Sequence, residues 1–276
     1  MAPSNNENSR TGTCKLTLKE GNFVKAHLIP KALTTPVQKG MPFFQWKSGA
    51  TPKRRWSSWY DQNLVTRNGE DILTEFDTWA ITELRKQKLV WSSWGKKKSL
   101  GPLHSAASGT PWGIRKIENI DPAKLRLFFL SLLWRAASTN LPEFAEVQLP
   151  QEDLETLRLL LLARQPGPIS FYPTTITQLS TIGIIQNHAP IAQTKEIPSL
   201  EPGEPTIEMP IFRFYFDGLI AHVHNHPSDD GYTAALGNLI VGASEQLVLT
   251  TQTYEGSWQR NNLITILSES KAPKKG

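Results

Sequence analysis

The most regular hydrophobic pattern in the chain lies at residues 121–137. Apolar side chains recur there at the i, i+3, i+4, i+7 spacing of one face of an α-helix. Asp121 is a good N-cap residue, and Pro122 stands where a missing N–H group costs nothing. Leu127 and Leu130 widen the apolar face, so we expect protein to surround this helix on most sides.

Two further stretches carry a helical pattern. Residues 70–86 place apolar side chains on one face, with acidic residues at the start and basic residues at the end, which matches the helix macrodipole. Another helix is expected to open at residues 150–153, to carry a stripe of leucines and to end before Gly167. This helix and the helix at 121–137 form a predicted central pair.

Strand-like segments lie on both sides of the central helices. Asp217-Gly218, between two of them, is a strong signal for a β-hairpin. Proline and glycine predict a loop at 193–209, and serine, glycine and lysine predict another at 91–113. We expect strands at residues 23–29, 43–46, 169–172, 181–185, 210–216, 219–224, 239–241 and 247–249.

These patterns predict an α+β fold with a C-terminal, mostly antiparallel sheet. We expect disordered tails at residues 1–13 and 268–276, a basic module at 14–115, and a helical and β body at 116–267. The chain of 276 residues is long enough to bury a sizeable core.

The net charge of +5 is unevenly distributed. Residues 1–60 carry ten lysines and arginines against two acidic residues, which indicates either a surface that faces a polyanion or a solubilising basic arm. We expect no membrane partner, because no apolar run reaches the ~18 residues that a membrane helix needs. Cys14 is the only cysteine, and the first residues do not resemble a signal peptide. A reducing compartment, the cytoplasm, is therefore expected.

Two basic clusters lie next to a repeated Trp-Ser-Ser-Trp tetrapeptide. The tetrapeptides occupy residues 56–59 and 91–94, and the clusters are Lys53, Arg54 and Arg55, and Lys96, Lys97 and Lys98. Aromatic and basic side chains together suit base stacking and phosphate contact. The alternative is that the tryptophans anchor loops to the core.

Residues 14–17, 26–33, 63–70 and 76–80 together resemble an HNH-type, treble-clef module. That family has a Cys-x-x-Cys knuckle, a strand that ends in a catalytic histidine, and a second knuckle that opens a helix. With residues 131–136 and 216–220, the chain resembles a group of bacterial proteins of unassigned function that carry this module. The resemblance covers most of the chain and implies a small N-terminal ββα module.

The positions that match the zinc ligands of this family are Cys14, Thr17, Thr66 and Gly69. A structural zinc needs four ligands such as thiolate or imidazole, and only Cys14 can supply one. The sequence therefore argues against a structural zinc. We expect packing to hold the module together instead, through Leu16, Val24, Leu64, Val65 and Phe76.

The resemblance also implies a set of catalytic positions. His27 matches the histidine that activates the attacking water, and Asn63 lies about two residues from the position that orients it. Glu70 matches the last metal-binding position, and Asp77 follows two turns later on the same helical face. Both carboxylates suit Mg²⁺ or Mn²⁺. The alternative is a strand-end histidine beside two helix-surface acids.

A separate cluster places His222, His224 and His226 at alternate positions of a predicted strand, so they share one face if the strand extends that far. Three imidazoles on one face can bind a transition metal. Pro227 favours the alternative, which is a polar strand end that enters a turn.

Three functional hypotheses follow from these observations. The first is a protein that associates with DNA or RNA and derives from an HNH endonuclease, and that hydrolyses phosphodiesters with a metal ion if it is active. The second is a non-catalytic binding or scaffold protein in which the module is purely structural. The third is a metal-binding protein centred on residues 222–226.

Overall fold

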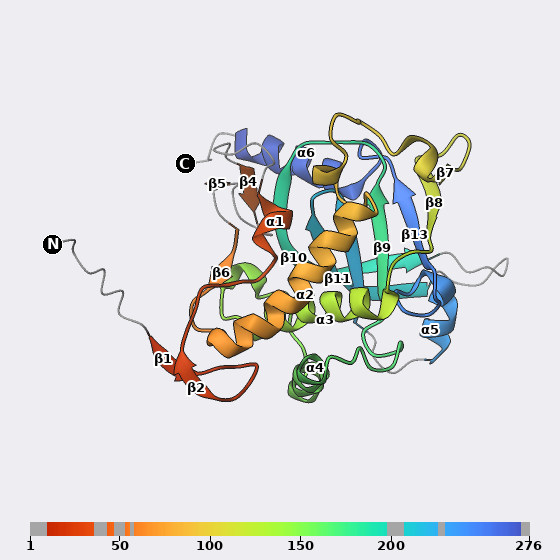
Figure 1. Cartoon of the computed structure of the whole chain (residues 1–276). Helices are drawn as coiled ribbons and strands as arrows, with labels where there is room; N and C mark the ends of the chain where they lie inside the picture. Colours follow the sequence, from red (N-terminus) through yellow and green to blue (C-terminus); the bar gives the residue numbers. More distant parts are fainter. Residues whose placement is uncertain are drawn as a thin grey trace.

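The computed structural model describes residues 10–35, 43–46, 53–55, 58–197, 207–225 and 230–271. A large sheet runs through the described part of the molecule (Figure 1). Its nine strands lie in the order β5-β4-β10-β11-β12-β9-β13-β8-β7. They are β4 (Phe43–Trp46), β5 (Lys53–Arg55), β7 (Ser105–Ala106), β8 (Trp112–Ile117), β9 (Thr174–Leu179), β10 (Gln186–Ile197), β11 (Ile207–Phe216), β12 (Leu219–His224) and β13 (Leu247–Gln252).

Most neighbouring strands of this sheet are antiparallel. Only β10 with β4 and β13 with β9 pair in parallel within the described residues. The expected α+β class with a mostly antiparallel sheet is therefore confirmed. The predicted hairpin joins β11 to β12, where Asp217 and Gly218 have φ of 50° and 79°. Positive φ at both positions is the geometry of a tight type I′ turn.

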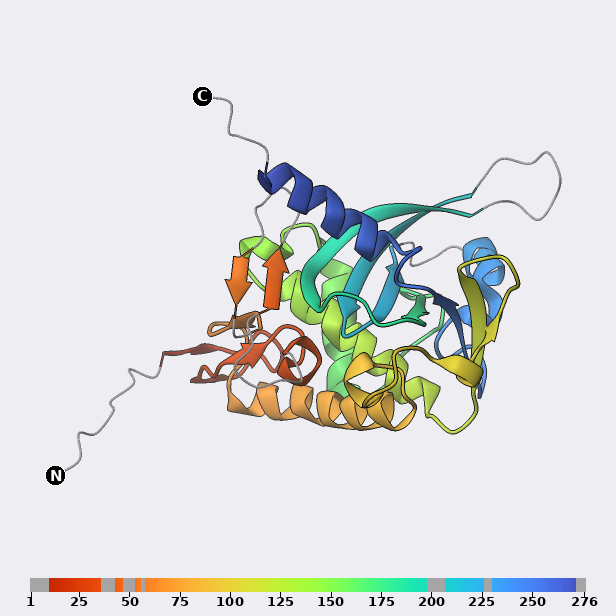
Figure 2. The ribbon, with the colours of Figure 1, turned by 90° about the horizontal axis from the view of Figure 1, so that it is seen from above.

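Helices cover both faces of the sheet. Figure 2 shows α2 and α3 on one side of the strands and α6 on the other. The described α-helices are α1 (Lys31–Thr34), α2 (Arg67–Lys86), α3 (Pro122–Ser138), α4 (Gln151–Ala163), α5 (Asp230–Leu236) and α6 (Trp258–Lys271). The short 3-10 turns are η1 (Trp91–Ser93), η2 (Gly101–Leu103), η3 (Pro142–Phe144) and η4 (Gly237–Leu239).

The helix α3 lies at the centre of the core, as its pattern predicts. The Oδ1 atom of Asp121 accepts a hydrogen bond from the backbone N–H of Lys124 at 3.0 Å, which caps the helix. Phe128 packs edge-on against Phe216 of the sheet, with ring centroids 6.4 Å apart. The apolar surface of α3 is thus removed from water on most sides, which is the dominant favourable contribution to folding.

The N-terminal region forms two small β-ladders beside α2. One pairs β1 (Thr11–Thr13) with β2 (Glu20–Asn22), and the other pairs β3 (Ala26–His27) with β6 (Tyr60–Asp61). The expected packing residues Leu16, Leu64, Val65 and Phe76 are buried, and Val24 packs against them. These side chains belong to the same hydrophobic cluster as α3 and the sheet. The basic module and the body therefore share one core.

Several expected elements differ from the structure. The strands expected at 169–172 and 181–185 are absent, and the one at 239–241 is replaced by η4 and a single bridge at Ile240. Strand β10 extends to Ile197 and β11 begins at Ile207, both within the loop expected at 193–209. Thr11–Thr13 is a strand, although a disordered tail was expected there, and residues 268–271 belong to α6. None of the helices among the described residues has the length and apolar character to span a bilayer.

Candidate functional site

The four positions at zinc-ligand spacing lie together in the structure. The Sγ atom of Cys14 accepts a hydrogen bond from the backbone N–H of Thr17 at 3.4 Å. A Cβ atom built on Gly69 would lie 2.7 Å from the same sulfur, and Thr66 also hydrogen-bonds to it. Burial raises the pKa of the Cys14 thiol, but the bonds from Thr17 and Thr66 outweigh it and the pKa lies below its ordinary value. Cys14 is the only one of the four that supplies a sulfur ligand.

His27 ends the short strand β3, opposite Tyr60 of β6. Its Nε2 atom is buried, and no hydrogen-bond partner for it lies among the described residues. Burial lowers the pKa of His27, and the positive charges of Lys25 and Lys31 lower it further. The imidazole is therefore neutral at pH 7, which is the form that can accept a proton.

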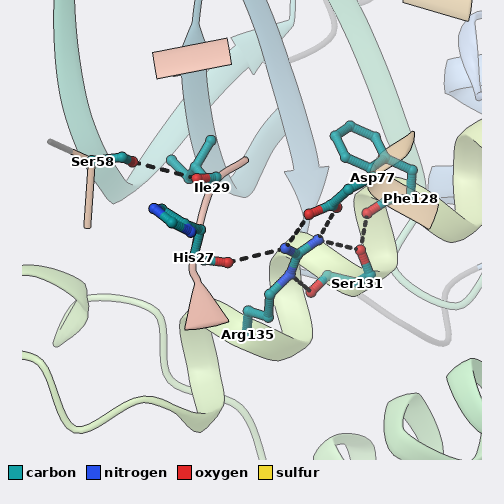
Figure 3. Close-up of polar contacts among 7 residues, drawn as sticks. All are labelled: His27, Ile29, Ser58, Asp77, Phe128, Ser131 and Arg135. Atoms are coloured by element: carbon teal, nitrogen blue, oxygen red, sulfur yellow. Dashed lines mark hydrogen bonds and ion pairs between the residues drawn. The ribbon is translucent and has the colours of Figure 1, made fainter. Parts of the chain in front are cut away.

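The carboxylate of Asp77 on α2 is held by Arg135 of α3. The guanidinium donates to both carboxylate oxygens, at 2.6 and 3.0 Å, and to the backbone carbonyl of His27 at 3.1 Å. Figure 3 shows this carbonyl facing Arg135, while the ring of His27 extends away from Asp77. The Arg135 side chain is 1% exposed and that of Asp77 is 18% exposed, so the pair is largely screened from water.

Glu70 lies two turns before Asp77 on α2 and is half-buried. Burial raises its pKa to about 7, with Arg135 acting in the opposite direction. In the described part of the chain no donor pairs with its carboxylate. Glu70 is therefore a partly buried carboxyl group that can exchange a proton near neutral pH.

Asn63 lies at the surface of the loop that follows β6. Its backbone N–H donates to the Oδ1 atom of Asp61 at 2.7 Å, and the other oxygen of Asp61 accepts from the Thr139 hydroxyl at 2.6 Å. No hydrogen bond joins Asn63 to His27 in the described residues. Arg135 thus links Asp77 to the backbone of His27, and Glu70 lies within electrostatic range of Arg135 and Asp77, whereas Asn63 lies outside this group.

The structure describes the side chains of one basic cluster but not those of the other. Lys53, Arg54 and Arg55 form β5, but their side chains lie outside the described part of the structure. Lys96, Lys97 and Lys98 are exposed in the loop after η1. That loop follows the C-terminal end of α2, roughly 24 Å along the helix from Glu70 at 1.5 Å per residue. The backbone of this loop hydrogen-bonds to Ser180 and Ile182 after β9, and not to the strand of His27.

The tryptophans beside these clusters are buried. Trp91 and Trp94 are 7% and 6% exposed, and Trp59 is 5% exposed and packs edge-on against Phe144. These three side chains anchor their loops to the core, as the structural alternative for the repeat predicts. Trp56 lies outside the described residues.

The three-histidine cluster is described only in part. His222 and His224 are buried on β12, and His226 lies outside the described residues. The Nε2 atom of His224 is 3.1 Å from the Thr175 hydroxyl. Within the described ranges, no group of three histidine, cysteine or acidic side chains could hold a metal ion. Metal binding at His222, His224 and His226 stays a prediction.

Arg135 is the site residue that the sequence pattern does not identify. It lies 58 positions from Asp77, and the contact depends on how α3 packs against α2. The available signal is an arginine on the apolar stretch of a helix predicted to be buried, because a buried cation needs a partner.

Comparisons of the chain with family models, with curated proteins and with solved structures give no match. The functional inference therefore rests on the residues and their geometry.

Proposed function

We propose that this chain is a nucleic-acid-associated protein built on an HNH-type, treble-clef-like module that no longer uses zinc. The observation that carries the proposal is the meeting of Cys14, Thr17, Thr66 and Gly69 at the start of α2, beside the strand that ends in His27. Residues from two separate stretches meet at the positions where the family places its four ligands. Packing of apolar side chains takes over the role of the metal.

The chemistry that we propose for an active site of this kind is phosphodiester hydrolysis. The neutral imidazole of His27 would accept the proton of the attacking water, and Asn63 would assist from the neighbouring loop. Glu70 is then the one candidate carboxylate that would hold a Mg²⁺ or Mn²⁺ ion. A single carboxylate suits Mg²⁺, because this ion takes few protein ligands besides phosphate and water. Such an ion, when bound, supplies charge stabilisation at the phosphate. Asp77 instead holds Arg135 in place.

The basic residues support a nucleic-acid partner in this proposal. Exposed Lys96, Lys97 and Lys98 would contact the phosphate backbone, and so would the cluster Lys53, Arg54 and Arg55. Both DNA and RNA are substrates in the test.

The alternative of a non-catalytic module is favoured by one specific observation. The Arg135 guanidinium already neutralises Asp77 and contacts the strand that carries His27. The Arg135 guanidinium thus occupies the position beside Asp77 where a metal-dependent enzyme would bind an exchangeable metal ion. In that case the module would bind nucleic acid or a protein partner without cutting it.

The test measures cleavage of plasmid DNA and of RNA in Mg²⁺ and in Mn²⁺. Wild type is compared with His27→Ala and Glu70→Gln. The matched control is His104→Ala, because the His104 imidazole contacts Thr251 of β13 and no residue of the candidate site. Binding of labelled DNA and RNA is measured in parallel at low and high salt. Cleavage lost in both site variants but kept in the control supports the nuclease proposal.

The other outcomes divide the remaining hypotheses. Salt-dependent binding without cleavage supports the non-catalytic alternative, and replacing all three lysines at 96–98 by alanine should then weaken binding and flatten its salt dependence. Absence of both binding and cleavage on DNA and RNA would contradict the nucleic-acid proposal.

A further inference from the structure

Strand β10 carries a half-buried lysine, Lys195, that the proposed function does not use. Among the lysines whose side chains the structure describes, Lys15 and Lys195 are half-buried and the others are exposed. The Lys15 ammonium donates to the backbone carbonyl of Ser138 at 2.5 Å. The Lys195 amine has no hydrogen-bond or ion-pair partner in the described part of the chain. Lys195 is therefore a partly buried amine that no neighbouring group holds.

The neighbour of Lys195 across the sheet is apolar. Lys195 stands opposite Met209 of β11 in the register, and residues opposite one another on neighbouring strands share a face of the sheet. Met209 is buried in a small hydrophobic cluster with Leu236 of α5 and Ile240. The segment that contains α5 and η4 thus brings apolar side chains to the face of the sheet that carries Lys195.

Lys195 is one of the residues that line a cavity of about 250 Å³. Ala235, Leu236 and Leu239 form an apolar wall of this cavity. Glu196 also lines it, but this side chain is exposed and forms no ion pair with a described residue. The volume is below the ~300 Å³ at which sites for drug-sized ligands begin, so the cavity suits a small compound.

Three threonines, Thr175, Thr177 and Thr250, also line the cavity. The Oγ1 atoms of Thr177 and Thr250 lie 2.8 Å apart, and Oγ1 of Thr175 lies 3.1 Å from Nε2 of His224. A hydroxyl group has one donor and two acceptor lone pairs, so each of these oxygens can take part in a further hydrogen bond. These hydroxyls provide polar partners without a fixed charge.

The surroundings of Lys195 favour the neutral form of its amine. Burial lowers the pKa of Lys195, and the positive charge of Arg213 lowers it further. A neutral amine has a free electron pair and is a nucleophile, whereas an ammonium group is not. Desolvation of a lysine, or a second cation near it, is a common way in which proteins produce a nucleophilic amine.

We propose that Lys195 captures small aldehydes in this cavity as an imine. The electron pair of the amine attacks the carbonyl carbon, and the carbonyl oxygen takes up a proton from the nitrogen, which gives a carbinolamine. Loss of water, which carries the former carbonyl oxygen and both amine hydrogens, then gives the C=N bond. Leu236 and Leu239 would contact the hydrocarbon part of the aldehyde, and the threonine hydroxyls would hydrogen-bond to its oxygen. This inference stands on residues outside the His27 region and does not depend on the proposed function.

The test uses butanal as the probe, with sodium cyanoborohydride to reduce the imine to a stable secondary amine. The intact wild-type protein is incubated with both reagents from pH 6 to pH 9, and mass spectrometry of its peptides measures the labelling rate of each lysine. Two other lysines serve as internal references. Lys97 is exposed, and Lys15 is half-buried like Lys195 but donates to a carbonyl.

Two alanine substitutions test whether the cavity is the site of the reaction. Ala235→Phe adds a ring to the cavity wall. Ala234→Phe is the matched control, because it adds the same ring at the preceding position of α5, which does not line the cavity. Both alanines are exposed, and near-ultraviolet circular dichroism checks that each variant keeps its tertiary structure.

We expect butanal to label Lys195 about 10-fold faster than Lys97 or Lys15 at pH 7, and the difference to narrow as the pH rises and the other amines lose their protons. Ala235→Phe should slow the labelling of Lys195 by a similar factor, whereas Ala234→Phe should leave it unchanged. Labelling of Lys195 that is no faster than that of Lys97 in wild type would overturn the proposal, and so would an unchanged rate in folded Ala235→Phe. If Ala235→Phe does not fold, the comparison of Lys195 with Lys97 and Lys15 in wild type decides.

Discussion

The guanidinium of Arg135 contacts both carboxylate oxygens of Asp77, at 2.6 and 3.0 Å, in a bidentate ion pair between α3 and α2. The same guanidinium donates to the His27 carbonyl on β3. Three elements that are separate in the sequence are therefore fixed relative to one another by one side chain. The position of His27 relative to α2 depends on this contact.

We expect Asp77→Asn to destabilise the protein by about 3–5 kcal/mol, because it leaves the buried guanidinium without its counter-charge. The free energy of unfolding is measured by urea denaturation. The control is Glu83→Gln, which removes the i,i+3 pair with the exposed Lys86 and should cost at most about 1 kcal/mol. An equal decrease in the free energy of unfolding of the two variants would show that the Arg135–Asp77 pair stabilises the protein no more than a surface ion pair does.

Glu70 should make stability depend on pH in a defined direction. Its pKa in the folded protein is raised from an ordinary 4.5 to about 7. Between these values the folded state binds more protons than the unfolded state, so the stability present below the unfolded pKa is lost as the pH rises toward 7. Glu70→Gln cannot ionise and should escape this loss.

The measurement is the unfolding free energy of wild type and Glu70→Gln from pH 4 to pH 8. The stability of the variant relative to wild type should increase across this range and level off above pH 7. A difference that stays constant with pH would mean that the pKa of Glu70 is not raised in the folded protein. Glu75→Gln is the control, since Glu75 is an exposed acid on the same helix.

Gly69→Ala tests the contact between the two stretches that resemble zinc knuckles. The added Cβ atom would lie 2.7 Å from Cys14 Sγ and 2.9 Å from Val65 Cβ, so we expect a loss of about 1–3 kcal/mol. In a Cys14→Ala background the sulfur is gone and part of this cost should disappear. A double-mutant cycle should therefore give a coupling energy above about 0.5 kcal/mol, whereas additive effects would contradict the contact.

Parts of the fold that depend on local signals could be predicted from the sequence. The cap at Asp121 and the long apolar face locate α3, and Asp217-Gly218 locates the hairpin. The sequence pattern does not reveal the strand β8, because its exposed positions are mostly apolar and its buried ones are not all apolar. Gly113 and Arg115 point inward, while Trp112 and Ile114 are about half exposed. The pattern does not reveal strand β10 either, because β10 buries polar residues that are typical of loops, such as Asn187 and His188.

In the candidate site, too, local signals could be predicted from the sequence, whereas contacts that depend on packing could not. The sequence offers His27 and Glu70 as candidates because they match positions of the family that it resembles, and Asp77 because it follows Glu70 by two turns of the same helix. The partner of Asp77 could not be identified, because Arg135 reaches it only through the packing of α3 against α2. The neighbours of Arg213 across the sheet, Ile191 and His222, likewise arise from strand register, which a single sequence does not specify.

The most direct test of the proposed module is to place cysteine at the three other positions that match the family's zinc ligands, with Thr17→Cys, Thr66→Cys and Gly69→Cys in one variant. If the four positions are the remains of a zinc site, the variant presents four thiolates around one point, and zinc binding should stabilise it strongly. Zinc titration with a colorimetric competitor, together with Tm, should show one tightly bound zinc and a zinc-dependent rise in Tm that wild type lacks. A folded triple variant that binds no zinc, or binds it without a change in Tm, would contradict the HNH-type interpretation of the N-terminal region.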